Sequence, residues 1–184
     1  MKVSAGSDEE VTPSSSPIAF DLVRGDDSVI PFVMTTERLP GYEEFVGTWD
    51  EAEHRAALAD GRHAYFVGLV SSEPVGFAIV RDWDSPERVV LLKRIAVSDP
   101  GHGMGRLLLA RVVDAVFEQT HAWRFWLGVF PYNERARRSF EAVGFQPEGI
   151  ARGNAFSGGV YRDELVMALL RPDWAAAKRL VSKA

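Results

Sequence analysis

The sequence predicts one α+β domain with a mixed, mostly antiparallel sheet of about seven strands and helices on both faces. Strand-like and helix-like segments alternate along the chain, a hairpin of apolar runs comes early, and a long strand-like run comes late. The early hairpin argues against a doubly wound parallel sheet. The 184 residues suit one domain, expected over residues 17–171. Residues 1–16 have little to bury and predict a disordered tail, and residues 172–184 predict a helical extension.

The first half of the domain predicts three strands and a helical region. A first strand is expected over residues 18–23. Residues 28–60 predict a helix in two pieces, because Pro40-Gly41 interrupts the pattern. The apolar runs 65–70 and 75–81 flank a Ser-Ser-Glu-Pro turn and predict a hairpin.

The second half predicts two helices among three further strands. The strands are expected at residues 89–97, 124–130 and 160–170. Residues 103–120 predict an amphipathic helix, because polar residues recur at helical spacing beside a broad apolar face. A second helix is expected to begin after Asn133 as its N-cap and to end before Gly144.

Composition excludes several kinds of site and partner. The chain has no cysteine, which removes disulfides, cysteine-bound metal and a cysteine nucleophile, and no motif indicates another metal. A net charge of −5 argues against nucleic acid. Without a membrane-length apolar run or a signal-peptide region, we expect a cytoplasmic protein that binds no membrane. The acidic residues of segment 41–60 form either a solvated helix face or a rim that attracts a cationic amine.

The most informative stretch is Ile95-Ala96-Val97-Ser98-Asp99-Pro100-Gly101-His102-Gly103-Met104-Gly105-Arg106. It leaves a strand, passes through a glycine-rich turn and enters a helix. Alternate glycines permit positive φ and close approach of a ligand, and unpaired N–H groups at a helix start attract anions. The pattern predicts either a phosphate cradle or a tight turn without a ligand. Arg106 excludes both the P-loop and the dinucleotide fingerprint, which need other residues at that position.

Three motifs resemble the GNAT superfamily of acetyl-CoA-dependent N-acetyltransferases. Pro100-Gly101-His102-Gly103-Met104-Gly105 is similar to its signature turn, Arg/Gln-x-x-Gly-x-Gly/Ala. The run from Asn133 to Phe145 resembles its Asn-x-x-Ala-x-x-x-Tyr-x-x-x-Gly-Phe helix. Gly159-Val160-Tyr161-Arg162-Asp163, followed by Met167-Ala168-Leu169, is similar to the branch that acetylates the N-termini of ribosomal proteins. The motifs occur in the family's order, so the resemblance covers nearly the whole domain and implies the GNAT fold.

The resemblance implies acetyl-CoA as co-substrate and gives roles to matching positions. The backbones of Ile95, Ala96 and Val97 would pair with the pantetheine arm as an added strand, and one of their N–H groups would polarise the thioester carbonyl. The pyrophosphate would be held by the turn residues Gly101, His102, Gly103, Met104, Gly105 and Arg106. Asn133 would contact the cofactor where the two central strands separate, and Phe140 would lie beside its sulfur.

The chain departs from the family pattern at its catalytic positions. Phe140 replaces the usual tyrosine acid, and Gly128 stands where some members carry a base glutamate. General acid–base assistance contributes about 10²–10⁴-fold, whereas positioning can contribute roughly 7–11 kcal/mol, so an active enzyme remains compatible with the loss. The departures favour an acceptor amine of low pKa or a base from elsewhere. Tyr161 is the catalytic residue that the resemblance best motivates.

The sequence therefore predicts an enzyme that transfers acetyl from acetyl-CoA to an amine of a small molecule or peptide, by direct attack in a ternary complex. One alternative is a catalytically silent acyl-CoA-binding sensor or regulator, which the two missing side chains support. Another is an unrelated nucleotide-binding domain. The sequence is compatible with a homodimer and does not specify the acceptor.

Overall fold

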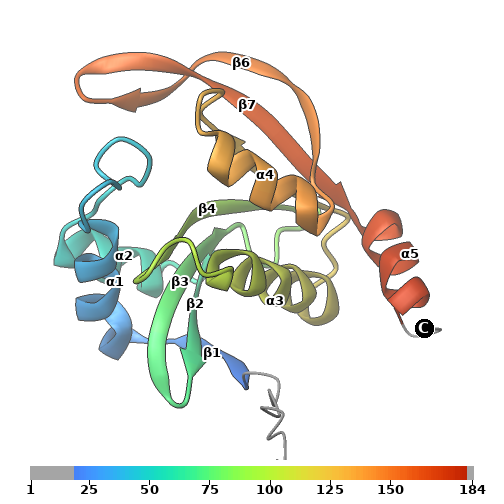
Figure 1. Ribbon diagram of the computed structural model, residues 1–184, viewed down its shortest axis with the longest axis horizontal. Coiled ribbons are helices and arrows are strands. Elements are labelled where there is room, and N and C mark those ends of the chain that lie inside the picture. The colour runs from blue at the N-terminus through green and yellow to red at the C-terminus, as the bar shows by residue number, and fades with distance from the viewer. Residues whose placement is uncertain (1–18, 182–184) are drawn as a thin grey trace, which may run out of the picture.

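The computed structural model describes residues 19–181, so the expected tail over residues 1–16 lies outside the described residues. The described residues form one sheet of seven strands in the order β1-β2-β3-β4-β5-β7-β6 (Figure 1). The strands are β1 (Phe20–Gly25), β2 (His63–Val70), β3 (Glu73–Arg81), β4 (Val89–Val97), β5 (Arg124–Val129), β6 (Gln146–Ser157) and β7 (Val160–Leu170). Only β4 and β5 pair in parallel, which confirms the predicted mixed and mostly antiparallel sheet.

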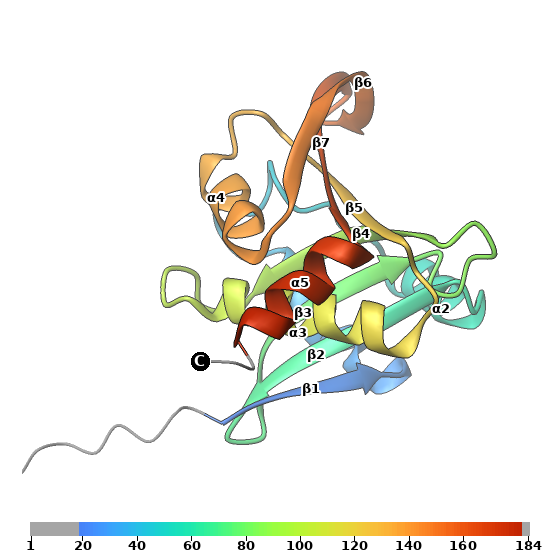
Figure 2. The same ribbon diagram turned by 90° about the vertical axis from the view of Figure 1, so that its right-hand side faces the viewer.

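Helices cover both faces of the sheet, as predicted (Figures 1 and 2). They are α1 (Ile30–Glu37), α2 (Glu51–Ala59), α3 (Met104–Gln119), α4 (Glu134–Val143) and α5 (Arg171–Val181), with a short 3-10 helix η1 (Asp27–Val29) before α1. Side chains of α3, α4 and α5 pack in a larger hydrophobic core on one face. Side chains of α1 and α2 pack in a smaller core on the other face. Helix α5 occupies most of the expected C-terminal extension.

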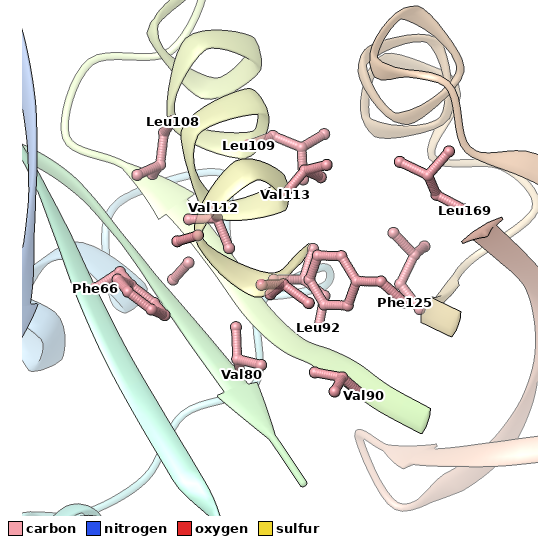
Figure 3. Packing of buried hydrophobic residues seen from close by; sticks show 14 of the residues in the cluster. Phe66, Val80, Val90, Leu92, Leu108, Leu109, Val112, Val113, Phe125 and Leu169 are labelled. Atoms are coloured by element: carbon pink, nitrogen blue, oxygen red, sulfur yellow. The ribbon is translucent and has the colours of Figure 1, made fainter. Parts of the chain in front are cut away.

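The larger core holds α3 firmly against the sheet. Figure 3 shows apolar side chains of α3 pointing onto the strands beneath them. The labelled residues of this contact are Leu108, Leu109, Val112 and Val113 of α3, and Phe66, Val80, Val90, Leu92, Phe125 and Leu169 of the strands. Because burying such a side chain contributes about 1.5–3 kcal/mol, several together fix the helix and the turn that precedes it.

The predicted ends of α4 are confirmed. The N–H of Ala136 donates to the side-chain oxygen of Asn133 at 3.2 Å, which makes Asn133 the N-cap. Gly144 follows the last helical residue with φ +108°, a left-handed conformation that favours glycine. Short-range backbone chemistry therefore determines both ends.

The structure corrects two predictions in the first half of the chain. The first strand begins at Phe20 rather than residue 18, and Ile18 lies outside the described residues. The predicted break at Pro40-Gly41 is confirmed, since α1 and α2 lie on either side of it, but the break is wider than predicted, because residues 38–50 contain no helix. Two causes are visible: Gly41 adopts φ +88°, and Asp50 forms a capping box that starts α2.

Strand β6 was not predicted. It is an edge strand with Pro147 and two glycines, Gly149 and Gly153, and most of its residues are exposed. Its pairing with β7 shifts register twice, so no alternation of apolar and polar residues marks it in the sequence. Figure 2 shows β6 and β7 turned steeply away from the layer that β1, β2 and β3 form.

Candidate active site

The predicted phosphate cradle is the turn between β4 and α3 (Figure 1). Gly101 and Gly103 adopt φ +106° and +79°, and Gly103 is the N-cap of α3. A Cβ atom at either glycine would meet no atom within 4 Å, so the space above the turn is open. The N–H groups of Arg106 and Leu107 bond to the Gly103 carbonyl at 3.1 Å, while the first N–H groups of the helix have no helical acceptor. This geometry fits an anion.

The other residues of the turn differ in their exposure. His102 is exposed and its Nδ1 lies 3.1 Å from the Asp99 carboxylate, so this pair lies at the rim. Arg106 is also exposed, whereas Met104 and Gly105 are half-buried at the start of α3. A Cβ atom on Gly105 would meet only the Val97 side chain, at 3.9 Å. The turn would therefore bind an anion mainly through backbone N–H groups in open space, rather than through a set of aligned basic side chains.

An opening separates β4 from β5 next to this turn. The parallel ladder pairs only Val89–Leu91 with Arg124–Trp126. Beyond it, β5 continues beside β7, whereas β4 keeps only β3 as a neighbour. Lys93 is an extra residue in β4, because its neighbours Leu92 and Arg94 pair with consecutive residues of β3, and this β-bulge bends the strand. The predicted pair of parallel strands that separate at their carboxyl ends is confirmed.

The backbone of β4 presents hydrogen-bonding groups to the opening. The N–H of Ser98 bonds to the Val75 carbonyl at 2.9 Å, and alternate residues of an antiparallel ladder bond to the same neighbour. Ser98 and Ala96 therefore bond toward β3, while Ile95 and Val97 turn their N–H and C=O groups toward the opening. The side chain of Ala96 is buried in the smaller core.

The hydroxyl of Tyr42 is hydrogen-bonded to both backbone groups of Val97. Its hydroxyl donates to the Val97 carbonyl at 2.9 Å and accepts from the Val97 N–H at 3.3 Å. Tyr42 is buried and lies in the segment between α1 and α2. A pantetheine arm that pairs with Val97 has to displace this hydroxyl. Sequence reasoning missed Tyr42, because no motif links it to the distant strand.

Asn133 and Phe140 lie on α4, which begins after β5 and packs beside α3. The side-chain oxygen of Asn133 is used in capping the helix. The Phe140 ring is buried and meets the Phe145 ring edge-to-face at 6.0 Å between centroids. The predicted cofactor residues thus come from both sides of the opening, β4 with its turn and α4.

The carboxyl group of Glu164 covers Gly128. A Cβ atom added to Gly128 would lie 2.5 Å from Glu164 Oε2 and 3.0 Å from Oε1. Gly128 pairs with Val166, and Glu164 is two residues away on β7, so both face the same side. That side is opposite to α3, because the flanking Leu127 is buried in the larger core. Asn154 Nδ2 donates to Glu164 Oε2 at 2.6 Å, and the side chain is half-buried.

Lys93 lies near this carboxylate. It is exposed, yet desolvation by the surrounding protein lowers the pKa of its ammonium. Arg94 and Arg81 add to this shift, and Glu164 opposes it. The mouth of the opening therefore contains charges of both signs.

A polar bridge joins β7 to the segment between α1 and α2. Arg162 donates to Glu44 at 3.1 Å and to the Tyr132 hydroxyl at 2.9 Å, and that hydroxyl donates to Glu44 at 3.1 Å. The rings of Phe45 and Phe130 lie 5.9 Å and 5.5 Å from the Tyr132 ring. Glu44 belongs to the acidic segment of the sequence, so part of that charge is paired within the fold.

A buried polar cluster fixes α1 and α2 behind β4. The fully buried Glu37 carboxylate accepts from Arg94 at 2.8 Å and from the Trp49 N–H at 3.0 Å. His54 contacts Glu37 at 3.4 Å and the Tyr65 hydroxyl at 2.8 Å. Burial lowers the pKa of His54 although Glu37 opposes this, and burial raises the pKa of Tyr65 to about 12. Burial therefore disfavours the charged form of His54.

Tyr161, the predicted catalytic residue, lies away from the opening. Tyr161 is 76% exposed near the tip of the β6–β7 hairpin, where its ring packs on Phe156 at 5.0 Å. Its catalytic role stays a prediction.

The described residues contain neither a cluster of metal-binding side chains nor a membrane-spanning helix. Over residues 19–181, no three or more His, Asp or Glu side chains gather in a way that would hold a metal ion. No helix within that range is long and apolar enough to cross a membrane.

Several solved structures that are similar to this chain are acetyltransferases. A spermidine N-acetyltransferase from Vibrio cholerae, solved with CoA and spermine, is similar with a TM-score of 0.74 and 19% identity, over 85% of this chain and 98% of that one. A ribosomal-protein-S5-alanine acetyltransferase from Vibrio fischeri is similar with a TM-score of 0.70 and 16% identity, over 84% and 94%. These likenesses confirm the predicted GNAT fold.

Two comparisons of sequence agree with this. A probable N-acetyltransferase of Bacillus subtilis strain 168, YjcK, is 40% identical over 73 residues, and the match spans 40% of this chain and 40% of that relative. The model of the acetyltransferase (GNAT) family matches residues 33–145, which include β4, the glycine turn, α3, β5 and α4. Members of that family take the acetyl group from acetyl-CoA, so the predicted enzyme class and co-substrate are confirmed. Since the match covers more than half of the chain, this protein belongs to the acetyltransferase (GNAT) family.

Proposed function

We propose that the chain transfers the acetyl group of acetyl-CoA to an amine by direct attack, with both substrates bound together. The observation that carries this proposal is the opening between β4 and β5, which begins beside an open glycine turn and is lined by backbone groups of Ile95 and Val97. An extended arm bound there would be held along β4 as an added strand.

The proposed position of the pyrophosphate sets the direction in which the cofactor would lie in the opening. Its pyrophosphate would lie at the turn Gly101–Arg106, on the N–H groups that have no helical acceptor, where positive φ and free space favour an anion. Its pantetheine arm would then pass Val97 and Ile95, so the thioester would lie near the bulge at Lys93. The Ile95 N–H faces the opening and is the donor we assign to the thioester oxygen. Asn133 and Phe140 would flank the arm from α4.

The reaction balances without a covalent enzyme intermediate. An acceptor ammonium first loses a proton, and the neutral nitrogen attacks the carbonyl carbon. A C–N bond forms, the C–S bond breaks, and the sulfur leaves as a thiolate that takes up a proton. Thiol pKa values lie near ~8.5, so this leaving group departs without strong acid assistance, which is compatible with Phe140 at the tyrosine position.

The acceptor is an amine of a small molecule or of a peptide. The similar structures named above come from proteins described as acting on spermidine and on a ribosomal-protein alanine, so we propose polyamines and peptide α-amines as the first acceptors to test. The acidic segment supports a cationic acceptor only in part, because Glu44 is paired with Arg162 and Glu51 with Arg55.

The test begins with binding and continues with turnover. We expect acetyl-CoA to raise the melting temperature and at least one amine of a panel to cause acetyl-CoA consumption with release of free thiol. Binding without consumption by any amine would instead support the second candidate, a silent acyl-CoA-binding module, which the absence of side-chain acid and base at positions 140 and 128 favours. Preferential binding of ATP or NAD would contradict both.

A further inference from the structure

We propose that Glu164 is the general base, which takes the proton from the acceptor ammonium before its nitrogen attacks. The inference rests on the proposed acetyl transfer and adds to it a residue from β7 that no motif marks.

The position of the carboxylate is the first argument. An arm that passes Val97 and Ile95 reaches the narrow end of the opening at Lys93. The parallel ladder of β4 and β5 ends two residues before Lys93 on one strand and two residues before Gly128 on the other, so these two residues flank that end. The Glu164 carboxylate fills the space above Gly128. A thioester at the bulge and this carboxylate would therefore be neighbours.

The surroundings of the carboxylate suit a base. Asn154 holds Oε2 at 2.6 Å, and within the described residues Oε1 accepts no hydrogen bond, so one oxygen is oriented and the other is available to a substrate. The side chain is half-buried, which leaves a route by which the proton reaches solvent. Charged groups on the same side are Lys93 at the bulge and Arg162 on β7, and Arg162 is paired with Glu44.

The approach of the acceptor is the second argument. Glu164 faces the side of the sheet opposite to α3, whereas Phe140 and Asn133 lie with α3 and α4. An amine that enters from the Glu164 side reaches the carbonyl carbon with its N–H groups toward Oε1. The proton passes from nitrogen to the carboxylate, the nitrogen lone pair forms the C–N bond, and the carboxyl group later returns the proton to water.

The absence of a side chain at Gly128 is part of the same arrangement. The three atoms nearest to a methyl group added at this position all belong to the Glu164 carboxyl, at 2.5–3.0 Å. An alanine at position 128 would therefore displace the Glu164 carboxylate, because no other group lies as close to the added methyl. Gly128 and Glu164 should act as a coupled pair.

The experiment compares E164Q with wild type on the amine that the panel identifies. Glutamine keeps an oxygen that can accept from Asn154 but takes up no proton, so kcat/KM should fall by about 10²–10⁴-fold near neutral pH. Acetyl-CoA binding, read from the melting temperature, should be retained. The deficit should shrink as pH approaches the pKa of the amine itself, because a neutral acceptor needs no base.

Two further variants separate catalysis from structure. D163N removes one negative charge from the next residue, whose side chain faces the opposite side and accepts from the Gly153 N–H at 2.8 Å, and it should keep wild-type kcat/KM. G128A should lower kcat/KM in wild type but cause no further loss in E164Q.

Two results would overturn the assignment. Equal kcat/KM and equal pH profiles for E164Q and an active wild type would remove Glu164 as the base and leave the proposed acetyl transfer standing. A wild type that binds acetyl-CoA and acetylates no amine would end both.

Discussion

Replacing Tyr42 by phenylalanine should strengthen CoA binding while it weakens the unliganded protein. The hydroxyl of Tyr42 makes two hydrogen bonds to the Val97 backbone, at 2.9 Å and 3.3 Å, and the side chain is only 7% exposed. Leaving such partners unsatisfied costs about 1–3 kcal/mol. For a domain of this size that corresponds to a fall of roughly 2–12 °C in melting temperature.

The free energy that Tyr42→Phe loses in the unliganded protein should strengthen its binding of CoA by the same amount. A pantetheine arm that pairs with Val97 supplies the missing partner, so the Tyr42→Phe complex loses nothing relative to wild type. The gain of about 1–3 kcal/mol corresponds to a roughly 5- to 150-fold lower Kd for CoA. Water at the opening can replace part of the lost hydrogen bonding, so we expect the lower end of this range.

Calorimetric titration with CoA and thermal unfolding with and without CoA test both signs. Tyr132→Phe is the matched control, because it removes a tyrosine hydroxyl that bonds to Glu44 and Arg162 and makes no hydrogen bond to Val97. It should leave the CoA affinity unchanged. Weaker CoA binding by Tyr42→Phe would refute the reasoning, because it would mean that the hydroxyl contacts the cofactor rather than competing with it.

Three further predictions test the turn, the buried histidine and position 140. A Cβ on Gly105 meets only Val97, at 3.9 Å, so Gly105→Val should stay folded yet lose CoA binding, measured by titration. Gly105→Ala, which the signature allows, should keep CoA binding. Wild-type affinity in Gly105→Val would place the pyrophosphate site elsewhere. The pKa of His54 is lowered in the folded state, so its protonation leaves the free energy of unfolding unchanged above the unfolded pKa of ~6.5 and lowers it below that pH, by up to about 1.4 kcal/mol per pH unit. Urea unfolding from about pH 7 to about pH 5 should show a steeper decline of this free energy in wild type than in His54→Gln. Equal slopes would contradict this. Phe140→Tyr should keep or raise turnover, by up to about 10²-fold, if position 140 lies beside the sulfur; a lower melting temperature that bound CoA does not restore would remove it from the site.

Local backbone chemistry made the glycine turn and the two ends of α4 predictable. Gly101 and Gly103 adopt positive φ, and Asn133 and Gly144 begin and end α4 as the sequence predicts, because each depends on a few neighbouring residues. The apolar pattern of α3 likewise predicts both its length and its buried face. The three motifs, in the order typical of the GNAT superfamily, carried the resemblance to that family, and the resemblance implied the separation of β4 from β5.

Strand β6 and the contacts of Tyr42 and Glu164 were decided by tertiary structure. Strand β6 has no strand-like pattern of its own, since an exposed edge strand with Pro147 and two register shifts depends on hydrogen bonds to β7. Tyr42 reaches Val97, and Glu164 covers Gly128, only because the folded sheet brings distant segments together. A carboxylate or a hydroxyl has no recognisable role in the sequence until its partner is known. The sequence by itself thus determined the glycine turn between β4 and α3, whose geometry is local, while the structure alone decided which side chains meet over the opening, because those contacts are long-range.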